Sequence, residues 1–321
     1  MQGVAHATLL LLISLSAVVQ TREYGEKRVR FSMRRKEVKN VNQADLVKYS
    51  TDGMDKPSID FLPGGLIPQP SSAGRSGSKG DDVGRIVGGT GASLGDNPWH
   101  TLITIDESFI CGGSLISNQY VLTAGHCVFK TSTCVVTAGI VDRTALSNGI
   151  TIISTNKILH PTYDDFYLYN NIALIKLPIS FLLGANINLI RLPKQSDATN
   201  TFDDSAVTIC GFGKKGNYAY PSTLLQNVGL TVTSQVACAN TYGTKAIISS
   251  MMCTAADEQK SVCGGDFGGG LMYEEADSKK TIIGIASFIS RRSCLRYPAV
   301  YTRVTSFLGW ISNNTGITIR P

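Results

Sequence analysis

The sequence predicts an all-β domain that covers residues 86–321. Three observations lead to this prediction. Short apolar runs recur from residue 86 onward, and clusters of glycine and polar residues separate them, as is typical of short strands joined by turns. No long helical pattern alternates with these runs, which argues against a parallel α/β sheet. Hydrophobic residues make up 43% and charged residues 17% of the chain, ordinary for a globular protein and too polar for a membrane protein.

The expected strands are the apolar runs themselves, taken in chain order. They lie at residues 100–105, 121–124, 134–138, 150–154, 172–177, 206–210, 230–232, 282–287 and 300–304. A short helix is expected over residues 304–312, because a helical turn places Val304, Phe307, Leu308 and Ile311 on one face.

The first 85 residues differ from the domain in composition. Residues 1–20 read as a signal peptide, because residues 9–15 are mainly apolar and small residues lie near their end. A buried apolar N-terminal segment is the alternative. Residues 21–85 are basic, and residues 63–74 are rich in glycine, proline and serine, so we expect a largely disordered pro-segment. No later apolar run reaches the roughly 18 residues that span a bilayer. We therefore expect a secreted, extracellular protein.

Most of the positive charge lies in the leader rather than in the domain. Residues 1–85 hold 13 Lys/Arg and 9 Asp/Glu, a balance of +4, and residues 86–321 hold 17 and 15, a balance of +2. The domain therefore gives no support for nucleic-acid binding. Two interpretations of the leader stay open, contact with an anionic polysaccharide and a solvated pro-segment.

All eight cysteines follow residue 110. An even number of cysteines in an exported chain indicates disulfides. The chain has no Cys-x-x-Cys pair and only four histidines, which argues against a zinc framework. We expect neither a metal nor a cofactor.

Four short motifs follow one another along the domain. They read RIVGG at residues 85–89, TAGHC at 123–127, NIALI at 171–175 and CGGDFGG at 263–269. Together they resemble the trypsin and chymotrypsin family of secreted serine proteases, and residues 238–243 (CANTYG) resemble its insect members. The resemblance covers residues 86 to about 317. It implies two packed six-stranded antiparallel β-barrels, a cleft between them and a short C-terminal helix.

By this resemblance, three residues occupy the positions of the catalytic triad: His126, Asn171 and Phe267. The family mechanism needs a serine nucleophile, a histidine base and an aspartate that orients the histidine. Phe267 cannot attack a carbonyl group. Asn171 cannot stabilise an imidazolium as a carboxylate does, and an amide there favours the wrong histidine tautomer. We therefore expect an inactive homologue in which His126 is a retained framework residue.

The residues that line the family's substrate pocket are altered as well. By resemblance, Ser261 lies at the base of the pocket, Phe288 and Ile289 form its wall, and Ala299 lies beside them. Ile289 and Ala299 stand where the family has glycines, so the extra carbon is expected to narrow or close the pocket.

The family's activation switch, in contrast, is kept as Arg85, Ile86 and Asp266. In the family, cleavage after the arginine frees an α-ammonium group that pairs with this aspartate and orders the cleft loops. The alternative for Asp266 is a turn residue that accepts hydrogen bonds from backbone N–H groups.

The resemblance also implies disulfides Cys111–Cys127, Cys238–Cys253 and Cys263–Cys294. Cys134 and Cys210 remain, and we expect them to pair with each other; a bond to another chain and two free thiols are the alternatives. The family's calcium loop carries glutamates and residues 139–152 hold none, so no calcium is expected.

The leading hypothesis is a secreted, non-catalytic serine protease homologue that binds or regulates an extracellular protein and is switched by cleavage after Arg85. The expected partner is an active protease, an inhibitor or a receptor. The first alternative is a weak or atypical hydrolase with an unusual nucleophile. The second is a precursor from which the basic leader is released, at residues 34–36 or at Arg85.

Overall fold

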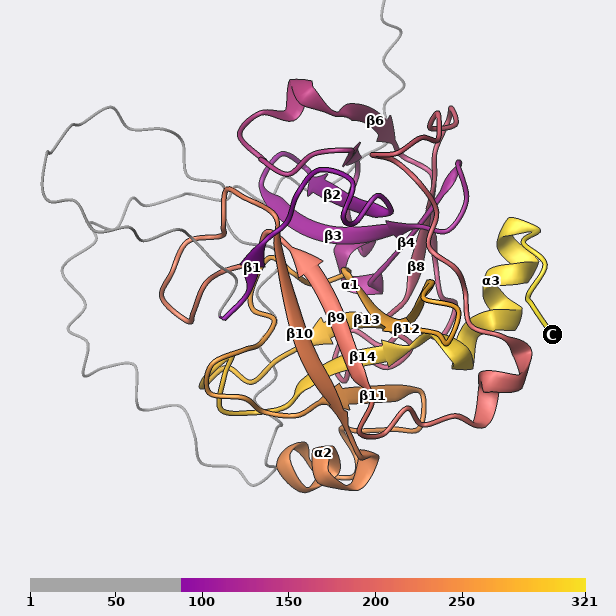
Figure 1. Ribbon diagram of the computed structural model, residues 1–321. Helices are drawn as coiled ribbons and strands as arrows, with labels where there is room; N and C mark the ends of the chain where they lie inside the picture. The colour runs from indigo at the N-terminus through magenta and orange to yellow at the C-terminus, as the bar shows by residue number, and fades with distance from the viewer. Residues whose placement is uncertain (1–87) are drawn as a thin grey trace, which may run out of the picture. The chain divides into compact units, whose positions relative to one another are not determined.

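The computed structural model of the protein describes residues 88–321 (Figure 1). The predicted signal peptide, the pro-segment and the pair Arg85 and Ile86 lie outside the described residues. The described chain is an all-β domain of two antiparallel sheets, as the sequence predicts. None of the helices within residues 88–321 is long and apolar enough to cross a membrane.

The first sheet has the strand order β6-β5-β2-β3-β4-β8-β7. Only Thr155 and Asn156 separate its two edge strands, β6 and β7, along the chain. Because β6 pairs with β5 while β7 pairs with β8, the sheet curls into a half-barrel. Its strands are β2 (His100–Ile105), β3 (Phe109–Leu115), β4 (Tyr120–Thr123), β5 (Cys134–Ala138), β6 (Ile150–Ser154), β7 (Lys157–Leu159) and β8 (Ala173–Lys176).

The second sheet closes into a barrel of six strands. Their order is β10-β11-β14-β13-β12-β9, and β9 pairs again with β10. Buried and more exposed residues alternate along β10, the pattern of a strand with one face on the core. The strands are β9 (Ala206–Gly211), β10 (Gln226–Thr233), β11 (Met251–Thr254), β12 (Gly270–Glu274), β13 (Lys280–Phe288) and β14 (Ala299–Arg303), with β1 (Thr90–Gly91) paired to the edge of β10.

The expected pair of six-stranded barrels therefore holds for the second sheet and needs a correction for the first. The first sheet has seven strands, because the interruption at Thr155 and Asn156 divides what would be a single strand into β6 and β7. The Ser154 hydroxyl donates to the carbonyl of Lys176 at 2.6 Å, and the Lys176 N–H donates to the carbonyl of Asn156 at 3.0 Å. These bonds hold the chain to β8 across the interruption.

The predicted C-terminal helix is confirmed. The 3-10 turn η4 (Val304–Phe307) leads directly into helix α3 (Leu308–Thr315), and Gly316 ends the helix at a left-handed φ of 74°. All four residues predicted for its apolar face are buried. The other helical elements are α1 (Gly125–Val128), α2 (Gln235–Tyr242), η2 (Leu146–Asn148) and η3 (Gln195–Thr199).

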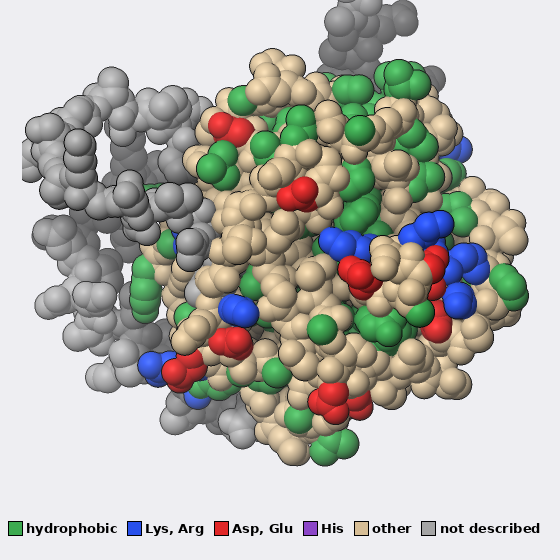
Figure 2. Space-filling view, in the orientation of Figure 1, with side chains coloured by type: hydrophobic (Ala, Val, Ile, Leu, Met, Phe, Trp, Pro, Cys, Tyr) green, Lys and Arg blue, Asp and Glu red, His purple; other side chains and the backbone are tan. Residues whose placement is uncertain are grey.

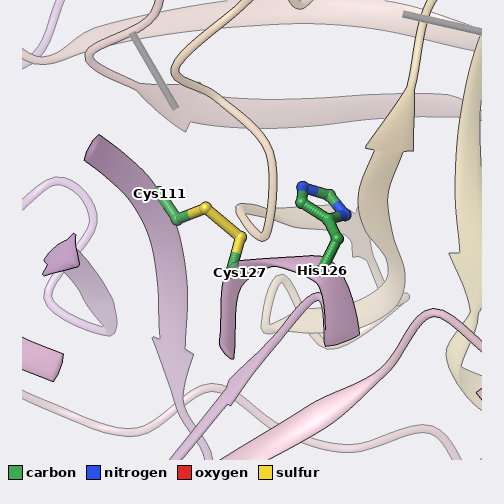
Figure 3. A group of neighbouring side chains, drawn as sticks. All are labelled: Cys111, His126 and Cys127. Carbon is green, nitrogen blue, oxygen red and sulfur yellow. A yellow bond between two sulfur atoms is a disulfide. The ribbon is translucent and has the colours of Figure 1, made fainter. Parts of the chain in front are cut away.

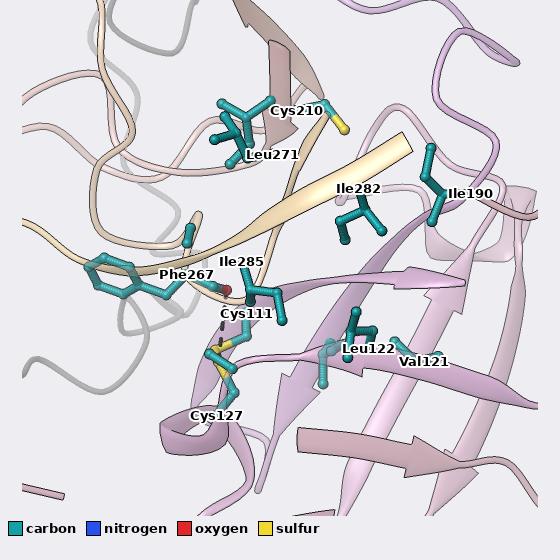
Figure 4. Close-up of a cluster of buried hydrophobic side chains, with 14 of the residues drawn as sticks. Cys111, Val121, Leu122, Cys127, Ile190, Cys210, Phe267, Leu271, Ile282 and Ile285 are labelled. Atoms are coloured by element: carbon teal, nitrogen blue, oxygen red, sulfur yellow. Dashed lines mark hydrogen bonds between the residues drawn. A yellow bond between two sulfur atoms is a disulfide. The ribbon is translucent and has the colours of Figure 1, made fainter. Parts of the chain in front are cut away.

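One apolar core connects the inner faces of the two sheets. Figure 4 shows part of it, with Leu122 from β4 close to Ile282 and Ile285 from β13. The elements that carry the triad positions meet at this junction. Their relative placement is therefore fixed by a packed core rather than by flexible loops.

Candidate functional site

The structure brings the three triad positions together at the junction of the two sheets. His126 lies on α1 directly after β4, Asn171 precedes β8, and Phe267 lies in the turn before β12. The first two residues come from the first sheet and the third from the second. The site therefore exists only because the two sheets pack against each other.

Asn171 is fully buried and every polar group of its side chain has a partner. Its Oδ1 accepts a hydrogen bond from the backbone N–H of His126 at 2.9 Å. Its Nδ2 donates to Oγ of Ser287 at 2.7 Å. The hydroxyl of Thr302 donates to the Asn171 carbonyl at 2.8 Å. The backbone N–H of His126 needs an acceptor, so the amide oxygen of Asn171 must face it. This fixes the orientation of the Asn171 side chain.

This orientation determines the tautomer of His126. Nδ1 of His126 lies 2.9 Å from Nδ2 of Asn171 and 3.3 Å from Oδ1. The Asn171 Nδ2 carries hydrogens, so the closer contact is a hydrogen bond in which the imidazole Nδ1 accepts. The proton of the neutral imidazole then lies on Nε2, the nitrogen that must be unprotonated in a serine protease base.

Burial also keeps the imidazole neutral. It lowers the pKa of His126 from 6.5 to about 4. At neutral pH the ring is therefore an uncharged donor at Nε2. That nitrogen cannot take a proton from a nucleophile.

Phe267 fills the position of the nucleophile with a packed aromatic ring. Its side chain is 4% exposed, and its ring lies 5.5 Å from the His126 ring at an interplanar angle of 80°. Its carbonyl accepts a hydrogen bond from the N–H of Gly112 at 2.8 Å and lies 3.8 Å from Sγ of Cys127 (Figure 4). No group at this position can form an acyl-enzyme.

The four residues assigned to the pocket are all buried. The exposed fraction is 5% for Ser261, 0% for Phe288, 4% for Ile289 and 1% for Ala299. Phe288 packs edge-on against the ring of Tyr242 at 5.6 Å, within a second apolar cluster. Ile289 and Ala299, which the resemblance places at pocket glycines, thus belong to the protein interior.

Asp266 is 1% exposed, and its carboxylate accepts hydrogen bonds from the N–H of Gly213 at 2.7 Å and of Cys263 at 3.0 Å. A Cβ on Gly211 or Gly213 would lie 2.2 or 2.1 Å from a carboxylate oxygen, so both positions need glycine. Burial raises the pKa of Asp266 from 3.8 to about 7, against these two hydrogen bonds. Within residues 88–321, no cationic side chain forms an ion pair with it.

The cysteines follow the expected pattern with one correction. Disulfides join Cys111 to Cys127, Cys238 to Cys253 and Cys263 to Cys294. The expected bond between Cys134 and Cys210 is wrong, since both are buried free thiols. Each packs inside its own sheet, Cys134 at the start of β5 and Cys210 near the end of β9.

Within residues 88–321, three potential metal ligands lie close together. Cys111, His126 and Cys127 place ligand atoms within 4.8 Å of one another (Figure 3). Both sulfurs are consumed by the disulfide between Cys111 and Cys127, and the metal ligand is a thiolate. The cluster therefore does not have the chemistry of a metal site.

Two residues of the site were not found by sequence reasoning as partners of the triad. Ser287 accepts from the Asn171 amide, and Thr302 holds the Asn171 backbone. Ser287 begins the segment SFI, which the resemblance assigns to the pocket wall, and this position is the sequence feature that could have indicated its role. Thr302 lies within the ordinary strand β14, and nothing in the sequence marks it.

These features define a two-sheet protein of the chymotrypsin-like class. Residues 86–311 match the family described as Trypsin. Brachyurin from Leptuca pugilator is 35% identical over 236 residues, which cover 73% of this chain and 100% of brachyurin. Collagenase from Hypoderma lineatum is 33% identical and covers 73% of this chain and 88% of the collagenase. A solved structure titled HL collagenase aligns with a TM-score of 0.67 at 32% identity, covering 73% of this chain and 100% of that one. The chain belongs to the trypsin family.

Proposed function

We propose that this member of the trypsin family is a secreted, non-catalytic protein that binds or regulates another extracellular protein. The observation that carries the proposal is the hydrogen bond from Asn171 Nδ2 to Nδ1 of His126, next to the buried ring of Phe267. The orienting group and the nucleophile are both replaced, and the retained histidine carries its proton on the nitrogen that a base needs free. The predicted signal peptide and the three disulfides support an extracellular location.

The size of these effects argues against residual protease activity. In a serine protease, replacing the orienting aspartate by asparagine lowers turnover about 10⁴-fold. Loss of the nucleophile alone lowers turnover about 10⁶-fold. The two losses do not add, because the triad acts as a unit, yet each is severe alone. The relatives named above carry protease names. On this proposal, the chain shares their fold but lacks a serine nucleophile and an orienting aspartate.

The retained activation elements support regulation by cleavage. Asp266 is a buried carboxylate whose described partners are two backbone N–H groups. A new α-ammonium group at Ile86, freed by cleavage after Arg85, is the cation that would complete this site. On this proposal, cleavage changes the conformation of the loops that bind the partner, an active protease, an inhibitor or a receptor.

The test is a series of variants cleaved after Arg85 and assayed on a peptide library. The parent should show no turnover. The double variant Asn171→Asp with Phe267→Ser should hydrolyse only small activated esters slowly, because the filled pocket still denies a peptide its attack geometry. Adding Ile289→Gly and Ala299→Gly should raise kcat/KM for peptides well above that of the double variant.

The control is removal of the imidazole. Turnover by the parent that disappears on His126→Ala would establish a hydrolase and overturn the proposal. Efficient peptide cleavage by the double variant would show that the pocket is open and that its buried residues were misinterpreted.

A further inference from the structure

Two loops of the second sheet concentrate positive charge on one part of the domain. Residues 214–220 read KKGNYAY and residues 289–297 read ISRRSCLRY, with no acidic residue in either. Residues 86–321 hold 17 Lys/Arg and 15 Asp/Glu, so without these five cations 12 remain against 15, a balance of −3. We call these two loops the basic surface; its cations are Lys214, Lys215, Arg291, Arg292 and Arg296.

The two loops are joined into one unit. Asn217 in the first loop donates from Nδ2 to the carbonyl of Arg292 at 2.9 Å and accepts from the N–H of Cys294 at 2.8 Å. The Lys214 N–H donates to the carbonyl of Gly264 at 2.8 Å. Gly264 is next to Cys263, which forms a disulfide with Cys294. The two loops that carry the five cations therefore lie side by side.

Side chains also order the backbone of the arginine loop. The Ser290 hydroxyl accepts from the N–H of Arg292 at 3.2 Å. The Ser293 hydroxyl accepts from the N–H groups of Leu295 at 3.2 Å and Arg296 at 3.3 Å. A partner would meet a loop whose backbone is already ordered, which lowers the entropy cost of binding.

The cations of the basic surface differ from the paired cations beside the C-terminal helix. Beside the C-terminal helix, blue and red side chains lie intermixed (Figure 2), and Arg191 pairs with Asp277 at 2.7 Å and Arg320 with Glu275 at 2.6 Å. Among the ion pairs within residues 88–321, none involves Lys214, Lys215, Arg292 or Arg296. Lys215, Arg292 and Arg296 are exposed. Their charge is available to steer an anionic partner.

Two tyrosines add apolar contact area to this charge. Tyr218 is 100% exposed and Tyr220 is 75% exposed, both in the loop that carries Lys214 and Lys215. Tyrosine and arginine are the residue types enriched at protein–protein interfaces, whereas exposed aromatic rings add nothing to the solubility of a domain.

We propose that the basic surface binds an acidic peptide segment of a protein partner. Guanidinium groups pair with carboxylates through two parallel hydrogen bonds, and apolar side chains between the carboxylates would contact the exposed tyrosine rings. A sulfated polysaccharide would match the charge but would not need the two rings. The inference rests on the proposed binding function and names the chemistry of the partner.

The test measures binding of a labelled peptide of about twelve residues, with Asp and Glu interspersed with Phe, to the full chain at about 50 mM salt. The triple variant Lys215→Gln, Arg292→Gln and Arg296→Gln should bind about tenfold more weakly. Tyr218→Ser should weaken binding of this peptide and leave unchanged the binding of a second peptide with Ser in place of Phe.

The matched control removes three exposed cations outside the basic surface, by Lys130→Gln, Lys245→Gln and Lys279→Gln. It has the same net charge and the same basic leader, and it should change the peptide Kd less than twofold. Equal losses in both triple variants would overturn the proposal, because binding would then follow net charge alone. Tighter binding of a sulfated polysaccharide than of the peptide, unaffected by Tyr218→Ser, would also overturn it. Failure of the non-catalytic function would appear separately, as peptide hydrolysis.

Discussion

Asp266 gives the uncleaved protein a dependence of stability on pH that a single substitution can isolate. Its carboxyl group is buried against Gly211 and Gly213, and burial raises its pKa from 3.8 to about 7. Between these two values the folded protein holds a proton that the unfolded chain has lost. The contribution of Asp266 to stability is therefore complete below pH 3.8, falls as pH rises, and is lost once pH passes about 7.

The magnitude follows from the shift of roughly three pKa units. One unit corresponds to 1.36 kcal/mol, so the full effect on the free energy of unfolding is about 4 kcal/mol. Of this range, about two units lie between pH 5 and the folded pKa of about 7, so the free energy of unfolding changes by about 3 kcal/mol between pH 5 and pH 8. Asp266→Asn removes the titration. It also has a constant cost, because the new amide places a donor against a backbone donor.

The assay is urea unfolding of the parent and of Asp266→Asn at pH 5 and pH 8, with Arg85 intact. The free energy of unfolding of the parent minus that of Asp266→Asn should be about 3 kcal/mol smaller at pH 8 than at pH 5; this difference is the advantage of the parent. Buried His100 and His126, whose pKa values are lowered to about 4, titrate in both proteins and cancel in the comparison. After cleavage at Arg85, an amine paired with Asp266 would lower its pKa, so the advantage should no longer shrink. A difference that does not change with pH in the uncleaved protein would refute this account of Asp266.

Three further predictions concern packing, thiols and cleavage. Phe267→Ala should lower the free energy of unfolding in urea by about 3 to 4 kcal/mol, because the ring is buried in the core, and a loss below about 1 kcal/mol would contradict that packing. Cys134 and Cys210 should resist a thiol reagent at pH 8 in the folded protein and react in denaturant, since burial raises their pKa values to about 11 and about 12. Rapid labelling of the native protein, detected by mass spectrometry, would contradict this prediction. Limited digestion with trypsin should cut after Arg85 before any site in the folded domain, and N-terminal sequencing that finds Arg85 intact would show the prediction to be wrong.

Apolar runs in the sequence predicted most of the sheet strands, because a run of buried side chains is a local property. The runs at residues 100–105, 134–138 and 150–154 became β2, β5 and β6 with the same bounds. Strands β3 and β12 were missed because each contains glycines, which weaken the sequence pattern of a strand. The glycines are needed where the two sheets pack closely, and this packing is not visible in the sequence. A Cβ on Gly270 would lie 2.6 Å from Oγ of Ser114 on the neighbouring sheet.

The positions of the site could be predicted, but their interactions could not. Family-like spacing located His126, Asn171 and Phe267, and chemistry alone indicated that Phe267 is no nucleophile. The partners Ser287 and Thr302 come from strands more than 100 residues away, at separations of 116 and 131 from Asn171. The pairing of Cys134 with Cys210 failed for a related reason, because counting cysteines says nothing about whether two sheets bring them together.

The tautomer of His126 is the most direct test of the central claim that Asn171 disables the base. In protein labelled with ¹⁵N, the nitrogen shifts of His126 at pH 7 should report a protonated Nε2 and an unprotonated Nδ1 that accepts from Asn171. Asn171→Asp should reverse this assignment, because a carboxylate accepts from Nδ1–H. A protonated Nδ1 in the parent protein would contradict the account, since it would leave Nε2 ready to take a proton.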